Sequence, residues 1–406
     1  MIPFSLKVFC LRVFMWALKL VTRILPVRQP DLFVGEGAAL KLVDHFARSG
    51  VKRLLLVTDA MLIKLGLLDA IQARLAFHQI QVTVYDGIEP DPSIEQIEAG
   101  LTLLQSHDCT AILAVGGGSS MDAAKVIAAR ATNPHKIRWM AGKLRVLFKP
   151  LPLYVIPTTS GTGSEVTIAA VVSDPANTRK FAIMDPALVP QGAALDPRLT
   201  QGLPPAITAA TGMDALTHAI EAYISHNHLP ETDFYALEAV RLISEFLPRV
   251  MDNGADLHAR EQMALASYKA GAAFTKAGVG YVHAIAHNFG ARYHIPHGLA
   301  NAIVLPHVLE FSKPACLKRL ADLARVSGLA RETLRDDELA DAFIAHIRAL
   351  NQRFGIPAKV ESLKAADIPL IAQAAIAEAR WTYAVPRYLT PAQCEALIAQ
   401  MLPAAS

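Results

Sequence analysis

The sequence of 406 residues contains only four cysteines, Cys10, Cys109, Cys316 and Cys394. They lie far apart along the chain, and none belongs to a C-x-x-C pair. This spacing excludes a disulfide framework and a zinc site built from thiolates. Free, scattered cysteines are typical of a reducing compartment, so we expect a cytoplasmic protein.

Charged residues are also few, at 18% of the chain, whereas hydrophobic residues make up 52%. A chain of this length and composition can bury a large interior without disulfides, and it is long enough for about two domains. Residues 1–30 carry five basic residues and no acidic one, and the rest of the chain has 34 basic and 36 acidic residues. A body so close to neutrality gives no electrostatic reason to expect nucleic-acid binding.

Long uninterrupted apolar runs are missing from this basic segment. Residues 2–27 are apolar overall, but an uncharged run such as Val13–Leu18 is too short for a membrane span or for a secretory signal. On a helix, Ser5, Arg12, Lys19 and Arg23 share one face, and Lys7 is the exception to this pattern. The apolar residues Phe9, Val13, Leu20 and Ile24 lie on other faces. Three interpretations stay open: an amphipathic helix on an anionic membrane surface, a helix packed on the protein or a partner subunit, and a mitochondrial transit peptide.

The remaining chain changes character near residue 200. In residues 31–200, short apolar runs at 53–58, 80–85, 111–115 and 153–156 alternate with helix-like stretches at 60–77 and 93–106. This alternation predicts a parallel, doubly wound α/β domain. Residues 201–406 are rich in Ala, Leu and Glu and show almost no strand pattern, so they are expected to form an all-helical domain.

Two turns have the composition of phosphate-binding loops. The run 111–115 leads into Gly116-Gly-Gly-Ser-Ser, where glycine lets backbone N–H groups approach an anion at the start of a helix. This motif is not G-x-G-x-x-G, and by itself it is equally compatible with a tight turn. The run 153–156 is followed by Pro157-Thr-Thr-Ser-Gly-Thr-Gly-Ser, whose hydroxyl and N–H groups suit pyrophosphate, ribose or a nicotinamide amide. The alternative is an exposed loop with helix-capping residues.

Asp59 follows the first of the predicted buried strands, 53–58. A carboxylate at this position accepts hydrogen bonds from ribose hydroxyls and repels a 2′-phosphate, which favours NAD over NADP. An ordinary N-cap for the helix from residue 60 fits the position equally well.

Histidines and one aspartate form a candidate metal site in the helical part. Asp214 and His218 are four residues apart and share a helix face, and His283 and His287 repeat this spacing. His297 follows in an Ile-Pro-His-Gly sequence. Imidazoles with one carboxylate suit Fe(II) or Zn(II). Each pair alone is weak, because single histidines more often pack in a core or cap a helix.

Four motifs together resemble the iron-containing (group III) alcohol dehydrogenase family in order and spacing, over about residues 31–310 and more loosely beyond. They are GGGSSMDAAK, PTTSGTGSEVT, GMDALTHAIEAY and GYVHAIAHNFGARYHIPHGLANAIVLPH. Ala284, where relatives often have glycine, is a small departure, and the basic N-terminal segment is not part of the pattern.

The resemblance implies a dinucleotide-binding domain, a helical metal-binding domain and a metal-dependent NAD(H) alcohol dehydrogenase acting on a small alcohol or its aldehyde or ketone. It implies Fe(II), or Zn(II), bound by Asp214, His218, His283 and His297. His287 would lie near substrate and nicotinamide and relay the alcohol proton. The implied cofactor contacts are Asp59, Gly117, Gly118, Ser119, Asp122, Thr158, Thr159 and Lys180. A homodimer or larger homo-oligomer is the expected assembly.

Two other activities fit parts of the same pattern. One is a hydroxyacid–oxoacid transhydrogenase that keeps its nicotinamide bound. The other is a non-redox lyase of the dehydroquinate synthase kind, which needs several basic residues around a phosphate-bearing substrate. The metal-site segments contain only Lys276 and Arg292, so the dehydrogenase is favoured.

Overall fold

The computed structural model describes residues 3–24, 27–177, 179–330 and 333–403. The chain forms two compact units. One unit is Pro26–Leu203 together with Gly254–Tyr268, and the other contains the N-terminal helix, Pro204–Asn253 and the chain from Lys269 onward. Residues 1, 2, 25 and 26 of the predicted basic segment lie outside the described residues.

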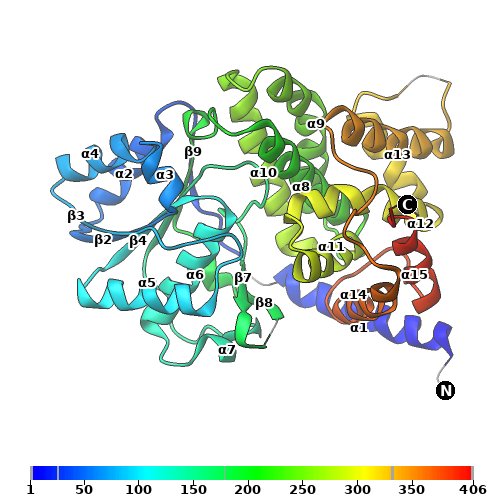
Figure 1. The fold of residues 1–406 in the computed structure, drawn as a ribbon, viewed down its shortest axis with the longest axis horizontal. Helices are drawn as coiled ribbons and strands as arrows, with labels where there is room; N and C mark the ends of the chain where they lie inside the picture. The colour runs from blue at the N-terminus through cyan, green and yellow to red at the C-terminus, as the bar shows by residue number, and fades with distance from the viewer. Residues whose placement is uncertain (1–2, 25–26, 178, 331–332, 404–406) are drawn as a thin grey trace. The chain divides into compact units, whose positions relative to one another are not determined.

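A six-stranded parallel sheet organises the first unit, with strand order β1-β9-β6-β4-β2-β3 (Figure 1). Its strands are β1 (Asp31–Val34), β2 (Arg53–Val57), β3 (Gln81–Tyr85), β4 (Ala111–Gly116), β6 (Leu153–Pro157) and β9 (Gly192–Leu195). A smaller sheet has the order β5-β8-β7 and contains β5 (Gly142–Lys143), β7 (Ala169–Asp174) and β8 (Arg179–Met184). Parallel β2, β3, β4 and β6 coincide with the four predicted strands, and the expected doubly wound α/β class is confirmed.

Helices cover both faces of the large sheet, which is why its central strands β2, β4, β6 and β9 are apolar without alternation. Leu54 and Leu56 of β2 face the core under α2 and α4, and Leu55 and Val57 face the core under α5 and α6. The helices of this unit are α2 (Ala38–Ala47), α3 (Ala60–Lys64), α4 (Asp69–Phe77), α5 (Ile94–Ser106), α6 (Gly118–Thr132) and α7 (Ile137–Met140). The predicted helix 60–77 is thus two helices, α3 and α4.

The second unit is helical. Its helices are α1 (Phe4–Ile24), α8 (Pro205–Ile224), α9 (Pro230–Asp252), α11 (Tyr281–Tyr293), α12 (His297–Val326), α13 (Asp336–Arg353), α14 (Ile368–Arg380) and α15 (Pro391–Ala399). Helix α10 (Leu257–Ala277) contributes its first half to the α/β unit and its second half to the helical one. None of the helices in the described part of the chain combines the length and apolar composition that a bilayer span requires.

A buried lysine fastens α6 to the segment before β7. Lys125 is fully buried, and its Nζ donates to the carbonyl oxygens of Thr167 (2.9 Å) and Ala169 (2.8 Å) and to Thr167 Oγ1 (3.0 Å). Burial lowers the pKa of Lys125, and the nearby carboxyls of Asp122 and Glu165 oppose that shift. The ammonium therefore satisfies buried acceptors and balances buried acids directly behind the glycine-rich turn.

We expect Lys125→Met to lower the free energy of unfolding by about 3 kcal/mol, because it leaves buried acceptors and acids without a cation. Urea unfolding followed by circular dichroism measures the loss. Lys136→Met, at an exposed position, removes the same charge and should stay within about 0.5 kcal/mol of the wild type. Equal stability of the two variants would contradict a structural role for the buried ammonium.

Candidate active site

The glycine-rich turn joins β4 to α6, and close packing leaves no room for a side chain at Gly116 or Gly118. A Cβ at position 116 would lie 2.5 Å from Ser120 Oγ, and a Cβ at position 118 would lie 2.6 Å from Thr162 Cγ2. Gly117 is the N-cap of α6. The first N–H groups of α6 therefore stay uncovered by side chains of the turn, in the arrangement that binds anions at helix N-termini.

The hydroxyl-rich second turn, residues 157–165, lies beside the first. Thr158 N donates to the carbonyl oxygen of Gly116 (3.0 Å), and a Cβ on Gly117 would lie 3.6 Å from the Thr159 side chain. The two turns thus meet where neighbouring strands β4 and β6 end. The carboxyl edge of an open parallel sheet is the general ligand-binding edge of such folds.

Asp122 lies in the second turn of α6, and both of its carboxylate oxygens accept hydrogen bonds from the protein. Ser164 Oγ donates to Oδ1 (2.6 Å), and Val171 N donates to Oδ2 (2.9 Å). Asp122 therefore holds the hydroxyl-rich turn, residues 157–165, and strand β7 against α6.

Ser119 and Lys180 meet at an aspartate that the sequence pattern did not single out. Asp91 N donates to Ser119 Oγ (3.2 Å), and Lys180 Nζ lies 2.6 Å from Asp91 Oδ2. Asp91 has a left-handed φ of 61°, a conformation that aspartate tolerates better than most residues. It joins the glycine-rich turn to β8.

Asp59 lies two residues after the end of β2, a strand that pairs with β4 in the sheet. It is the N-cap of α3, and its Oδ1 accepts from Leu62 N (3.0 Å). The capping role is therefore present. The other oxygen, Oδ2, could accept a hydrogen bond from ribose. That contact stays a prediction.

The four candidate metal ligands come together in the helical unit. Asp214 and His218 lie one turn apart on α8, His283 lies in the first turn of α11, and His297 is the first residue of α12. One ligand atom from each residue lies within 4.8 Å of all the others. Gly298 allows this approach, because a Cβ there would overlap the carbonyl oxygen of Ala210 on α8.

The chemistry of this cluster suits a divalent transition metal. Asp214 Oδ1 lies 3.9 Å from His283 Nε2 and 3.5 Å from His297 Nε2. Burial lowers the pKa of His283 well below its ordinary value, so this imidazole is neutral, the form that binds metals. Three imidazoles and one carboxylate are a donor set for Fe(II) or Zn(II). The His297 side chain is 37% exposed and leaves the cluster open on its side.

Asn301, one turn after His297, lies among the ligand atoms. Its Nδ2 donates to Asp214 Oδ1 (2.7 Å) and lies 3.2 Å from His283 Nε2 and 3.1 Å from His297 Nε2. Asn301 is fully buried. It therefore orients the Asp214 carboxylate from a position within the cluster.

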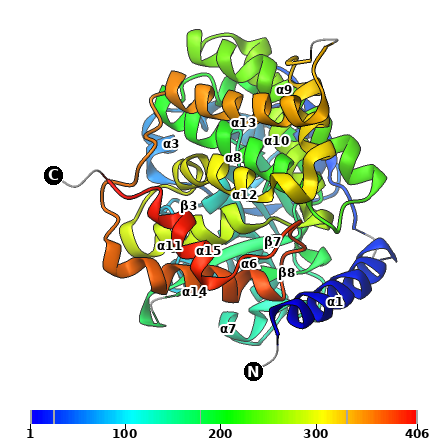
Figure 2. The same ribbon diagram turned by 90° about the vertical axis from the view of Figure 1, so that its right-hand side faces the viewer.

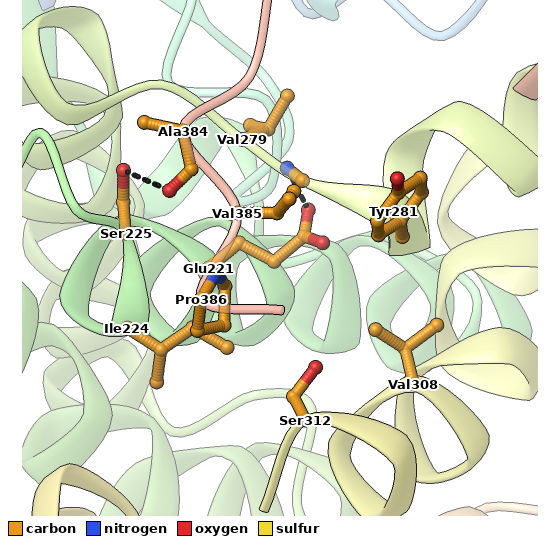
Figure 3. A pocket seen from close by; sticks show the side chains of 11 residues that line it. Glu221, Ile224, Ser225, Val279, Tyr281, Val308, Ser312, Ala384, Val385 and Pro386 are labelled. Carbon is orange, nitrogen blue, oxygen red and sulfur yellow. Dashed lines mark hydrogen bonds between the residues drawn. The ribbon is translucent and has the colours of Figure 1, made fainter. Parts of the chain in front are cut away.

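Glu221 orients His283 from the side opposite the cluster. Its Oε2 lies 2.6 Å from His283 Nδ1, and the carboxylate also accepts from Gly280 N (2.9 Å) and Val282 N (2.8 Å). Figure 3 shows the carboxylate pointing toward the start of α11, in a small pocket that Val308 also lines. Burial raises the pKa of Glu221 to about 7. Such a carboxylate holds the proton of the imidazole on Nδ1 and leaves Nε2 for a metal.

His287 lies one turn after His283 on α11 but takes a different environment. Its Nδ1 lies 2.8 Å from Glu378 Oε1, and Tyr383 OH donates to the same oxygen (2.7 Å). The side chain is 35% exposed, and its ring stacks on that of His297 at 5.3 Å between centroids. These residues form a line of proton-carrying groups beside the cluster.

The sequence patterns missed Asp91, Glu221, Asn301, Glu378 and Tyr383. Two of them had a usable signal, because Glu221 lies three residues after His218 and Asn301 lies four residues after His297. The others come from distant segments whose approach no spacing reveals.

Comparisons with known proteins point to one enzyme family. The family model described as iron-containing alcohol dehydrogenase matches residues 30–197, and the model of the C-terminal part of that family matches residues 208–402. The NAD-dependent methanol dehydrogenase of Bacillus methanolicus is 37% identical over 363 residues, covering 89% of this chain and 95% of that protein. Long-chain-alcohol dehydrogenase 1 of Geobacillus thermodenitrificans is 40% identical over 331 residues, covering 81% and 83%.

A solved structure of 1,3-propanediol oxidoreductase superposes with a TM-score of 0.90 at 37% identity. The match covers 93% of this chain and 100% of that one.

We expect Glu221→Gln to weaken metal binding roughly 10- to 100-fold. A glutamine side chain has one acceptor oxygen for these three donors. Its NH2 group would therefore face an N–H donor of α11 or of the His283 ring. Competition with a chromogenic chelator measures the affinity of the purified protein. Glu378→Gln changes a carboxylate that does not contact a ligand atom and is the matched control. Unchanged affinity in Glu221→Gln would rule out the orienting role.

Proposed function

The chain belongs to the iron-containing alcohol dehydrogenase family, and on that premise we propose that Asp214, His218, His283 and His297 bind its catalytic metal. The enzyme interconverts an alcohol and its aldehyde or ketone with NAD(H). The observation that carries the ligand assignment is the convergence of four buried or half-buried donor atoms from three helices. Fe(II) is the expected metal, and the same donor set accepts Zn(II).

When bound, the metal supplies Lewis-acid chemistry that lowers the pKa of an alcohol hydroxyl, and NAD supplies a hydride acceptor. The residues of the chain have positioning and proton-handling roles. Glu221 and Asn301 hold the donor atoms of His283 and Asp214 in fixed orientations. A preset geometry lowers the cost of orienting the reactants.

We assign proton transfer to His287. It is near the cluster yet partly exposed, so it can exchange a proton between the substrate hydroxyl and solvent. Glu378 accepts from Nδ1 of the ring and holds the ring in one orientation. His287 is therefore a proton relay and not a fifth ligand.

We assign the cofactor to the carboxyl edge of the parallel sheet. The N-terminus of α6 with Gly117 and Gly118, and the hydroxyls of Thr158 and Thr159, suit the pyrophosphate and nicotinamide parts. Ser119 and Lys180 border the same turn through Asp91. Asp122 supports the turn by holding Ser164, so its contact with the cofactor is the least direct.

The substrate is proposed to be an aliphatic alcohol. Relatives whose names specify methanol, 1,3-propanediol and long-chain alcohols are similarly close, at 37%, 41% and 40% identity, so they do not select a chain length. A homodimer, and a contact of residues 2–27 with a membrane surface, are also predictions for this chain.

His283→Ala and His287→Asn should fail in different ways. Loss of a ligand should remove metal and abolish NADH formation, measured at 340 nm under anaerobic conditions with Fe(II)- or Zn(II)-loaded protein. His287→Asn should keep its metal and lower kcat for alcohol oxidation on the order of 10²-fold, because the substrate proton loses its acceptor.

Metal analysis of both variants separates the two roles. If His287→Asn lost metal as His283→Ala does, the relay assignment would be wrong. If the wild type formed no NADH with either metal but exchanged hydride between a hydroxy acid and an oxo acid, the transhydrogenase would replace the simple dehydrogenase.

Asp59→Asn keeps an N-cap for α3 and removes the negative charge. We expect the preference for NAD over NADP, measured as the ratio of kcat/KM values, to fall by roughly tenfold, because repulsion of the 2′-phosphate is lost. Asp69→Asn, on α4, is the charge-matched control. An unchanged ratio in Asp59→Asn would leave the residue as a helix cap only.

A further inference from the structure

Helix α1 lies outside the residues that match the family, which begin at residue 30. It is nevertheless attached to the helical unit along one face. Leu11 and Met15 are buried, Phe14 packs edge-on against Trp381 at 5.2 Å, and Lys19 Nζ donates to the carbonyl oxygen of His226 (3.0 Å). Figures 1 and 2 both show α1 beside α14 at the edge of this unit.

The opposite face of α1 carries an exposed apolar stripe, defined as Leu6, Phe9, Val13, Trp16 and Leu20. These side chains are 42–63% exposed, and Phe9 and Trp16 are the most exposed at 63%. Steps of three and four residues keep them on one face, so the stripe is continuous over about 21 Å. A continuous exposed stripe of large apolar residues indicates a contact surface.

Basic residues flank this stripe. At about 100° per residue, Arg12 and Arg23 project from the edge between the stripe and the buried face, and Lys7 projects from the other side. Arg12 and Arg23 are exposed. No acidic residue lies in residues 1–30 to neutralise them. The helix therefore combines an apolar face with a purely positive border.

We propose that α1 docks the helical unit onto an anionic bilayer surface, with its apolar stripe in the headgroup–acyl boundary and its basic border on lipid phosphates. Helices that lie in the membrane interface have this combination of aromatic and aliphatic residues beside arginine and lysine. Burial of Leu11 and Met15 against the protein leaves the stripe as the face that meets the lipid.

A second copy of the chain fits the same surface less well. The stripe has heptad spacing, but Arg12 and Lys19 would occupy the positions that border a paired helix. An antiparallel pair would bring these cations together, and a parallel pair would offer them no acidic partner. Charge therefore favours a lipid surface over a helix of the same sequence.

The test uses the full chain with phosphatidylcholine vesicles and with vesicles that also contain phosphatidylglycerol. We expect cosedimentation with the anionic vesicles, release by high salt, and a blue shift of tryptophan emission as Trp16 enters the interface. Phe9→Glu/Trp16→Glu should weaken binding by roughly tenfold or more. Phe234→Glu/Leu370→Glu, which changes two exposed apolar residues on α9 and α14, is the matched control and should bind as the wild type does.

The electrostatic part has its own pair of variants. Arg12→Gln/Arg23→Gln should lower affinity for anionic vesicles by about fivefold per charge. Lys359→Gln/Lys364→Gln removes the same net charge from exposed positions elsewhere on the unit and should have little effect.

Dehydrogenase activity on a short alcohol should be the same in all of these variants, which separates failure of this proposal from failure of the proposed function. No binding to anionic vesicles at low salt would overturn the proposal, as would equal binding by Phe9→Glu/Trp16→Glu. Conversion of a dimer to a monomer by that variant, without vesicle binding by the wild type, would identify the stripe as a subunit interface instead.

Discussion

The contact between Glu221 and His283 connects the packing of helices α8 and α11 with the orientation of a candidate metal ligand. A buried carboxylate on α8 receives the first backbone N–H groups of α11 and, at 2.6 Å, Nδ1 of the His283 ring. The same interaction thus completes a helix N-terminus, joins α8 to α11 and fixes the tautomer of a candidate metal ligand. Asp214 and His218 lie on the same helix as Glu221, so their positions relative to His283 depend on this contact.

In the α/β unit, backbone N–H groups stay accessible at the edge of a densely packed sheet. The central strands β2, β4, β6 and β9 are mostly buried, and the turn after β6 packs on Gly118, where a Cβ would overlap Thr162. Hydrogen bonds from buried polar residues, and not large side chains within the turns, hold the two turns in place. Lys125 and Asp122 tie α6 to the segments that follow the second turn.

Helix α1 contributes to neither of these sites. The rest of the chain is nearly neutral, whereas α1 exposes both apolar and basic residues. In the proposed arrangement, membrane attachment and catalysis use separate surfaces of the molecule. A membrane contact of this kind would bring the enzyme close to alcohols that partition into lipid without changing the chemistry of the site.

The sequence by itself determined the features whose signals are local. Three strongly apolar runs became β2, β4 and β6, because a strand buried on both faces can be recognised without its neighbours. The run 80–85 became β3, a partly exposed strand at the edge of the sheet. The spacing of Asp214 and His218, and of His283 and His287, fixed which residues share a helix face. The motif order identified the family and, with it, the NAD-dependent redox chemistry. Strands β1, β7, β8 and β9 escaped notice because they are short or partly exposed and gain their order from pairing.

Only the tertiary structure decided how the equally spaced histidines differ. His283 is buried against Glu221, whereas His287 meets Glu378 and Tyr383 from a segment about ninety residues away. The structure also divided α10 between the two units and engaged Asp122 with Ser164 and Val171. For α1 it selected the buried face, which the pattern of charges had left open. In each case the deciding contacts join residues far apart in sequence, and packing of the whole chain, not local spacing, brings them together.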